Sequence, residues 1–542
     1  MKKTIVLIVL LLTPLIVNAK SMTAVEYIGK IASDNNADKT SINAIGNTGL
    51  AYDGTVDNNL RYIGVNPNNY VDIGDRYKTD IYAGYQWDGD LYRFYSSEEE
   101  CKESEFYNNG ILNIGCKKIH SKGDKILWRI IGVMNNIETI NGKETKLKLR
   151  RAESLGWYTI DSSPAPINGG TGISEWEQTD LNHILNAGYE SVEEDIYKYV
   201  SPFNCEYVET KKVNNSFYWN SEKGLCIEPN NNSVINNCDF RGTGLTESAK
   251  MFIDEVVWDT GTYSETDYYD VISTPATIYN WERTGIRNRK DSYSHETAND
   301  TVERTAKWTG KIGIMYISDL GFSAAGSDQT SRDICLSINM MYGDGLGQDA
   351  ASAWFKNKDC LNSSWLNENS PMEATMTFDD QYGISSSFVY GDEEIYTTWI
   401  TNPGNVHPVF YLNNDAVITT GDGTSANPYQ LRLEKSASIE VKISSKKELN
   451  KLFNDIGNDI KWVVKDTSIL KIENNTIIPL KVGVTEVTGE KDNIIYNLKV
   501  VVTDDFFINP KTSNNFIIII IILFSIILFR YFMINHNTKI NR

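Results

Sequence analysis

Histidine is scarce in this chain of 542 residues, which has five, and the short motifs of common catalytic sites are missing. The sequence contains no H-E-x-x-H, no G-x-S-x-G and no C-x-x-C. The first absence argues against a zinc metalloprotease and the second against an α/β-hydrolase. The third argues against a paired-thiolate zinc or redox site. We therefore assign no catalytic residue and no metal ligand.

Basic residues are also in short supply, with 52 Lys and Arg against 71 Asp and Glu, so the net charge is −19. A protein that binds nucleic acid through bulk charge needs the opposite balance, and we expect no nucleic-acid partner. Hydrophobic residues make up 41% and aromatic residues 11%, which is more than a disordered chain carries. Most of the chain should therefore fold.

The N-terminus has the pattern of an export signal. Lys2 and Lys3 precede an apolar run from Ile5 to Val17, and Ala19 ends the small-residue sequence after it. This order predicts a secretory signal peptide over 1–19 with cleavage after Ala19. The alternative is a membrane anchor, but the run is short for a hydrocarbon layer of about 30 Å.

A second apolar run near the C-terminus predicts a transmembrane helix over 516–534. Its single charged residue is Arg530, near the end, where a long side chain can reach the interface. Lys539 and Arg542 follow in the tail over 535–542. Because basic residues stay on the cytoplasmic side, we expect a single-pass protein with its body outside the cell.

A short motif lies in the linker over 504–515, before this run, and consists of Asn509, Pro510, Lys511, Thr512 and Ser513. With the apolar span and the basic tail, it resembles the cell-wall sorting signal of Gram-positive surface proteins, of the NP(Q/K)T type read by class B sortases. The resemblance implies cleavage after Thr512 and transfer of Thr512 to a wall precursor. Ser513 departs from the Gly or Asn expected at the fifth position, and a retained membrane anchor is the alternative.

Seven cysteines, none in a C-x-x-C pair, suit an exported protein with disulfides. The sequence does not fix their pairing. We expect pairs that are close in sequence, with Cys205 left over: Cys101 with Cys116, Cys226 with Cys238, and Cys335 with Cys360. The alternative is that reducing surroundings keep several of them free.

Residues 439–503 alternate apolar and polar positions in short segments with turns, for example at Asn474-Asn475. This pattern predicts an all-β sandwich, with Trp462 as its aromatic core residue. The sequences W-x-x-x-D-x-S-I-L-x-I from Trp462, K-x-G-x-T from Lys481 and Y-x-L-x-V from Tyr496 resemble a bacterial immunoglobulin-like group 2 (BIG2) domain. The resemblance implies a stalk or spacer on a cell-surface protein.

Residues 20–433 have no repeat, and we expect one large α+β domain. Strands are expected in Asp57–Gly64, Asn66–Val71, Leu127–Met134 and His407–Leu431, and a strand followed by a Gly-rich turn in Trp308–Gly326. Helical periodicity appears in Glu175–Tyr189 and in Leu245–Trp258, where Thr246 is the expected N-cap. Few helices among many short strands indicate an α+β fold.

The motifs NLRYIG, NPNNYV, LWRIIGVM, VNNSFYWN, WTGKIGIMY and PVFYLNNDAVITTGDGTSANPYQL resemble an uncharacterised family of surface proteins from low-GC Gram-positive gut bacteria. The last motif also resembles the closing strand of C-type-lectin-like and formylglycine-generating-enzyme-like folds. His407 stands where those folds have Arg.

The remaining candidate sites are weak. Glu228-Pro229-Asn230 matches the EPN triplet of C-type lectins, but no Trp-Asn-Asp partner follows, and a loop is the better interpretation. We expect no cofactor, and calcium at an acidic loop is the alternative left open. The expected function is that of an adhesin-like protein, anchored at the cell surface, which binds a glycan or protein ligand. An envelope enzyme of a formylglycine-generating-enzyme-like fold and a passive wall protein are the alternatives.

Overall fold

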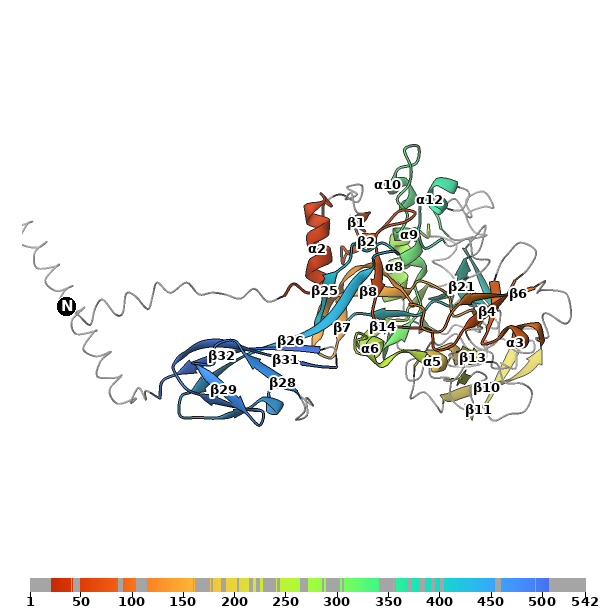
Figure 1. Ribbon diagram of the computed structural model, residues 1–542. Coiled ribbons are helices and arrows are strands. Elements are labelled where there is room, and N and C mark those ends of the chain that lie inside the picture. Colours follow the sequence, from red (N-terminus) through yellow and green to blue (C-terminus); the bar gives the residue numbers. More distant parts are fainter. Residues whose placement is uncertain are drawn as a thin grey trace, which may run out of the picture. The chain divides into compact units, whose positions relative to one another are not determined.

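A computed structural model describes most of residues 21–505, and the chain divides into two compact units, Met1–Leu433 and Glu434–Arg542 (Figure 1). Within 21–505, the residues not described are 40, 42–48, 86–90, 104–114, 159, 161–175, 177–178, 187–191, 202–203, 214–217, 221–224, 228–239, 241–243, 264–271, 285–286, 289–302, 305–306, 341–353, 355–356, 368–372, 380–385, 391–394, 400–403, 454–459 and 493. The expected signal peptide, sorting motif and membrane span lie outside the described residues. Among those that are described, no helix is long and apolar enough to cross a membrane.

The described residues form a β-rich fold with few helices, as the sequence predicts. The main sheet of the first unit has the strand order β19 (Ile312–Gly313), β24 (Val409–Tyr411), β8 (Gly142–Arg151), β7 (Trp128–Thr139), β3 (Tyr70–Asp72) and β26 (Tyr429–Lys442). Beside this path, β1 (Leu50–Tyr52) pairs with β2 (Leu60–Tyr62), β2 with β7, and β25 (Ala416–Thr420) with β26. The pairing of β3 with β26 is parallel, with Val71 beside Tyr429, and the pairing of β25 with β26 is antiparallel.

The hairpin of β7 and β8 forms the centre of this sheet. Its turn contains Gly142 at φ 103°, a left-handed conformation that glycine adopts without strain. In β8, Leu147 and Leu149 alternate with Lys146, Lys148 and Arg150, and all five are buried. The alternation alone would predict a solvent-facing cationic side, but here both faces of the strand are covered. Each buried cation therefore needs a carboxylate partner.

The first unit also contains two smaller sheets of more than two strands. One has the order β22 (Ile395–Trp399), β21 (Ser386–Tyr390), β20 (Glu373–Asp379), β23 (Gly404–Asn405) and β9 (Trp157–Tyr158), with β15 (Thr262–Tyr263) beside β20. The other has the order β5 (Leu91–Tyr95), β4 (Ile81–Tyr85) and β6 (Gly115–His120). Two-stranded ribbons are β10 (Val192–Ser201) with β11 (Asn204–Val213), β12 (Tyr218–Asn220) with β13 (Leu225–Ile227), β14 (Val256–Asp259) with β18 (Lys307–Gly310), and β16 (Arg287–Asn288) with β17 (Glu303–Arg304).

The helices that the structure describes in the first unit are short. They are α2 (Ala24–Asp34), α3 (Glu98–Glu103), α5 (Asp180–Leu185), α6 (Glu247–Lys250), α8 (Pro275–Thr284), α9 (Ile317–Phe322), α10 (Arg332–Cys335) and α12 (Lys358–Asn362). The helix expected over Glu175–Tyr189 is reduced to α5, because Thr179 caps it by accepting a hydrogen bond from the Asn182 amide. Its predicted apolar residues Leu181, Ile184 and Leu185 are buried.

The helix expected over Leu245–Trp258 is wrong beyond its first turn. Thr246 caps it as predicted, since its hydroxyl accepts from the Ala249 amide, but α6 ends at Lys250. Val256–Asp259 instead forms β14, which is antiparallel to β18. The β-branched pair Val256-Val257 suits a strand, and pairing with β18 overrides the helical spacing. In Trp308–Gly326, the expected Gly-rich turn contains α9, which sequence reading missed.

Glycines shape the turn between β25 and β26. Gly423 has φ 80°, and a Cβ atom there would lie 2.3 Å from the Asn68 carbonyl oxygen. The Tyr70 amide donates to the Gly423 carbonyl oxygen at 2.8 Å. The predicted GDGTSANP turn is therefore attached to the start of β3, and only glycine fits this close approach.

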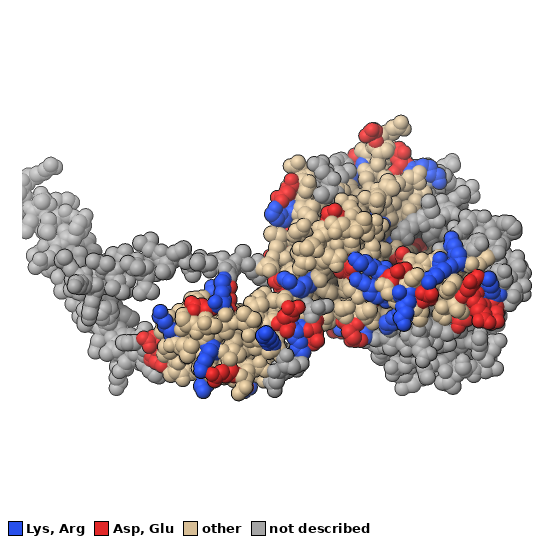
Figure 2. All heavy atoms as spheres, viewed as in Figure 1, with Lys and Arg blue, Asp and Glu red and all other residues tan. Residues whose placement is uncertain are grey.

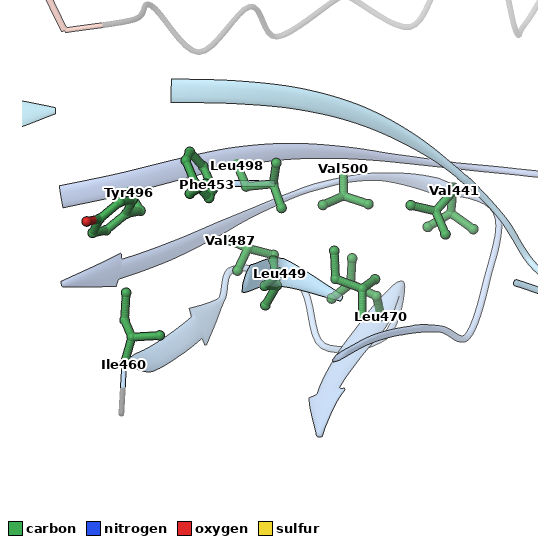
Figure 3. Close-up of a cluster of buried hydrophobic side chains, with 11 residues drawn as sticks. Val441, Leu449, Phe453, Ile460, Leu470, Val487, Tyr496, Leu498 and Val500 are labelled. Carbon is green, nitrogen blue, oxygen red and sulfur yellow. The ribbon is translucent and has the colours of Figure 1, made fainter. Parts of the chain in front are cut away.

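The second unit has two sheets that share one core. One sheet has the order β26, β32 (Ile494–Thr503), β31 (Gly483–Lys491) and β28 (Lys461–Val464), and the other β27 (Lys447–Glu448), β30 (Thr476–Pro479) and β29 (Leu470–Glu473). A short 3-10 helix, η4 (Leu449–Lys451), follows β27. Figure 3 shows apolar side chains of both sheets pointing into this core, among them Leu470 of β29 and Val487 of β31. The predicted turn at Asn474-Asn475 is present, with φ 48° and 56°, and joins β29 to β30.

Trp462 packs at the margin of this core and is not fully buried. Its ring stacks on Phe453 with centroids 6.3 Å apart, and its Nε1 donates to the Asn475 side chain at 3.2 Å. This hydrogen bond satisfies the polar end of the indole, which a central position in the core would leave unpaired.

Two of the expected disulfides are present. Cys101 of α3 is bonded to Cys116 of β6, and Cys335 of α10 to Cys360 of α12. Cys238, one partner of the third expected pair, lies outside the described residues. Cys205 lies on β11, where its Cα pairs with that of Tyr199.

Charges of both signs are interspersed over the described surface of each unit (Figure 2). The acidic residues gather most clearly at α3, whose sequence is EEECKE. Lys and Arg side chains also lie close together over the middle of the first unit in this view.

Candidate functional site

A solvent-open hollow lies in the first unit between the main sheet and the three-stranded sheet of β4, β5 and β6. Its cavity volume is about 30 Å³, and the hollow is partly open to solvent. We call it the Tyr77 pocket, and the lining residues that matter most are Asp75, Tyr77, Lys78, Phe94, Arg151 and Tyr158. They come from the turn between β3 and β4, from β5, from the end of β8 and from β9.

The turn after β3 presents Asp75 and Tyr77. Asp72, the last residue of β3, accepts a hydrogen bond from the Gly74 amide at 2.9 Å, and Gly74 has φ 80°. This aspartate turn reverses the chain. Tyr77 then packs with Ile81 and Ile126 in a small apolar core that also contacts Phe94.

Asp75 is a buried carboxylate, only 1% exposed. Its Oδ1 accepts from the amides of Arg76 at 3.1 Å and Thr246 at 3.3 Å. No donor of the described residues reaches its Oδ2. Burial raises the pKa of Asp75, although the nearby charge of Arg151 acts in the opposite direction.

Arg151 is fixed at the other side of the pocket. Its Nη1 donates to the carbonyl oxygens of Glu153 and Ser154, both at 2.8 Å, and its Nη2 donates to the Tyr77 hydroxyl at 3.1 Å. Its Nε is buried and has no hydrogen-bond partner in the described structure. The guanidinium is therefore held rigidly by neighbouring groups.

Tyr77, Glu153 and His120 form a linked group beside the pocket. The Tyr77 hydroxyl donates to Glu153, and His120 Nε2 lies 2.9 Å from Glu153 Oε2. The rings of Tyr77 and His120 stack with centroids 4.3 Å apart. Burial raises the pKa of Tyr77, and Glu153 raises it further. Burial opposes ionisation of Glu153, but hydrogen bonding to His120 and the charge of Arg151 lower its pKa overall.

Tyr77 and Glu153 each keep one protonation state at neutral pH. A phenol with a raised pKa stays protonated, and a carboxylate with a lowered pKa stays ionised at neutral pH. Neither is poised to exchange a proton near pH 7. The arrangement orients hydrogen-bond donors and acceptors at a pocket wall.

The Cys101–Cys116 disulfide supports the same sheet. It joins α3 to β6, which pairs with β4, and His120 ends β6 opposite Ile81 (Figure 1). The loop closed by the bond spans 15 residues. A cross-link there restricts the strands that carry Ile81 and His120.

A second polar cluster is fully buried in the first unit. Arg61 Nη1 lies 2.6 Å and Lys148 Nζ 2.5 Å from Asp319, and Arg61 Nε lies 3.0 Å from Asp53. These side chains are at most 1% exposed. Since solvent and ligands do not reach them, we assign the cluster to the core.

His407 also belongs to the core. It is 2% exposed, and its Nδ1 lies 2.8 Å from Glu373 Oε1, which accepts from Arg150 at 3.1 Å. It does not line the Tyr77 pocket. The position that resembles the Arg of lectin-like folds thus contributes to a buried ion cluster.

The other sequence candidates are placed as follows. Ala19, Asn509, Pro510, Lys511, Thr512, Ser513 and Glu228-Pro229-Asn230 lie outside the described residues. Within the described part of the chain, no three His, Cys, Asp or Glu residues are grouped as metal ligands would be.

The pocket residues were not predicted, because they come from four separate segments and form no local motif. The turn sequence D-I-G-D-R-Y, from Asp72 to Tyr77, is the local pattern that could have pointed to the pocket.

No protein-family model matches the chain, and neither a curated protein nor a solved structure does.

Proposed function

We propose that this protein is exported, is anchored in the cell envelope and binds a ligand with its first unit at the Tyr77 pocket. One observation carries the binding proposal: a solvent-open hollow is lined by a rigidly held Arg151 and by Asp75, whose Oδ2 has no partner among the described residues. Because Asp75 lines the hollow, this oxygen can accept a hydrogen bond from a ligand or from water.

Export and anchoring are supported by the sequence patterns at the two ends. The two disulfides agree with an oxidising compartment. In this proposal, the second unit is a BIG2-like immunoglobulin domain that acts as a spacer, and its two sheets with a common core suit that fold. The first unit is then an α+β head of C-type-lectin-like or related architecture.

The anchor is tested by mass spectrometry of envelope digested with a muralytic enzyme. Wall attachment predicts a mature chain that ends at Thr512 and carries a wall fragment. Recovery of peptides from 516–542 on the mature protein would contradict sorting and leave a retained membrane anchor.

The binding function is tested with the full-length chain in a polyoxyethylene detergent, applied to a glycan array and to insoluble peptidoglycan. We expect saturable binding without chemical change of the ligand. Turnover of a bound compound would favour the alternative of an envelope enzyme. Absence of binding to glycans, wall and host proteins would favour a passive wall protein.

A further inference from the structure

We propose that one end of the second unit lies on the lipid bilayer in which the chain is anchored, with Leu480, Val482 and Val484 in the bilayer interface. This inference goes beyond ligand binding, but it rests on the membrane anchor proposed over 516–534. It concerns the chain before sorting, or the chain with a retained anchor.

Three large apolar side chains are exposed close together where β30 is connected to β31. Leu480 and Val482 are each 48% exposed, and Val484 is 54% exposed. Val484 of β31 pairs with Val501 of β32, which is only partly buried, whereas Val487 is buried on the core side of the same strand. Apolar side chains grouped in this way on the solvent side mark a contact surface.

This apolar group lies at the end of the second unit where the chain leaves it. Gly483, the first residue of β31, pairs with Val502 near the end of β32. The Ile443 amide, just after β26, donates to the Thr503 carbonyl oxygen at 2.9 Å. The start of β31 and the ends of β26 and β32 therefore meet at one end of the unit, which we call the exit end.

The anchor brings the bilayer to the exit end. Residues 506–515 separate Asp505 from the apolar run over 516–534, and this many residues bridge at most about 40 Å. The tether makes contact with the bilayer intramolecular, so a weak apolar contact is enough to keep it formed. Any other partner would have to compete from solution, and we therefore assign the surface to the bilayer.

Charge should contribute little to this contact. Lys442 and Lys481 are exposed at the exit end, and their long side chains can reach lipid phosphates. Asp504 and Asp505 lie at the same end and oppose this attraction. The apolar side chains should therefore carry the contact, and it should persist at high salt.

The test uses the chain from Lys20 to Arg542, which the proposed signal cleavage leaves, reconstituted in phosphatidylcholine vesicles. A photoreactive diazirine amino acid replaces Val484 in one sample and Glu490 in another. Both positions are exposed on the same face of β31, about 20 Å apart along the strand. Because an interfacial contact is only about 5 to 10 Å deep, we expect at least about fivefold more lipid adduct at 484 than at 490 by mass spectrometry.

Substitution of the apolar side chains tests their role. With the diazirine at 484, Leu480→Ser together with Val482→Ser should lower the yield of lipid adduct at least about threefold, because apolar surface at the contact is lost. Val463→Ser is the matched control, since Val463 is 61% exposed and pairs with Thr488, four residues along β31 from Val484. It should leave the yield unchanged. All the substituted side chains are exposed, so the fold should be retained.

Equal lipid adducts at 484 and 490, or none at 484 in vesicles that hold the chain, would overturn the contact and leave the proposed anchor standing. Adducts of 484 with protein instead of lipid would overturn the bilayer as the occupant. An unchanged yield in the double serine variant would show that these side chains do not make the contact. If alkaline washing releases the chain from the vesicles, the proposed anchor fails and this inference fails with it.

Discussion

Asp319 neutralises two buried cations, and this makes it the most informative single residue of the first unit. It contacts Arg61 Nη1 at 2.6 Å and Lys148 Nζ at 2.5 Å. Burial opposes ionisation of Asp319, but Lys148 and Arg61 outweigh it and lower its pKa to about 2. Burial lowers the pKa of Lys148 to about 8 despite the carboxylate. Both groups are therefore charged at neutral pH. Asp319 has two cationic partners, so its loss would leave both of them without their shared counter-charge.

We predict that Asp319→Asn lowers the free energy of unfolding by about 3 to 5 kcal/mol, because two buried cations lose their shared counter-charge. Urea unfolding at pH 7 measures the change. Asp254→Asn is the control, because the Asp254 side chain is partly exposed and its partner Lys146 also contacts Glu144. A smaller loss in Asp319→Asn than in the control would contradict the assigned role.

The pH dependence of stability follows from the same residue. Since the folded pKa of Asp319 is about 2 and its ordinary value is 3.8, its stabilising contribution is present above about pH 4 and is lost as the pH falls toward 2. The expected contribution is about 2 kcal/mol. Urea unfolding between pH 5 and pH 2 should show a shallower loss in Asp319→Asn than in the unaltered chain. If the free energy of unfolding falls equally with pH in both chains, other acidic groups dominate the loss of stability in acid.

The partners of buried charged residues could not be predicted from the sequence. The alternation of Leu and Lys in β8 predicts a half-exposed strand, but Asp254, Asp319 and Glu373 come from distant segments and cover Lys146, Lys148 and Arg150. No local pattern reveals such partners. Asp75 and Arg151 are hidden for the same reason, since they are 76 positions apart in the sequence.

Among the elements, local chemistry was predicted better than tertiary pairing. The Asn474-Asn475 turn and the Thr246 cap depend on residues close in sequence, and both are present. The boundary between α6 and β14 depends on β18, about 50 positions away, and was predicted wrongly. The Cys335–Cys360 bond was predicted from sequence distance alone and is present.

We predict that replacing Cys335 and Cys360 together by Ala lowers the free energy of unfolding by about 3 kcal/mol, as expected for a closed loop of 25 residues. Both positions are buried, so Ala avoids adding a polar group. Thermal unfolding with and without a reductant measures the effect. Reductant should destabilise the unaltered chain more than the double variant, and an equal response would count against this bond.

The cap of α2 gives a smaller prediction. The Thr23 hydroxyl accepts from the Glu26 amide, and the Glu26 carboxylate accepts from the Thr23 amide at 2.8 Å. Thr23→Ala should therefore cost about 1 kcal/mol, whereas Thr23→Ser should cost much less because it retains the acceptor. Chemical denaturation of both variants measures the loss of free energy of unfolding. Equal losses in the two variants would exclude the cap as the cause.

At the scale of the whole molecule, the two compact units predict two separable unfolding transitions. Leu470 is completely buried in the core of the second unit (Figure 3). Leu470→Ala should destabilise that unit by about 3 kcal/mol and leave the other transition unchanged. Val463→Ala, at a position 61% exposed in the same unit, is the control. Differential scanning calorimetry tests this, and a joint shift of both transitions would show that the units unfold together.

The continuity of β26 has a mechanical consequence. Tension along the axis of β26 is carried by the pairing of its first residues with β3 and β25. Such a pull loads several hydrogen bonds of the ladder at once, in shear, whereas a pull across the strand would open them one at a time. The C-terminal attachment of the first unit is therefore built to resist stretching along this strand.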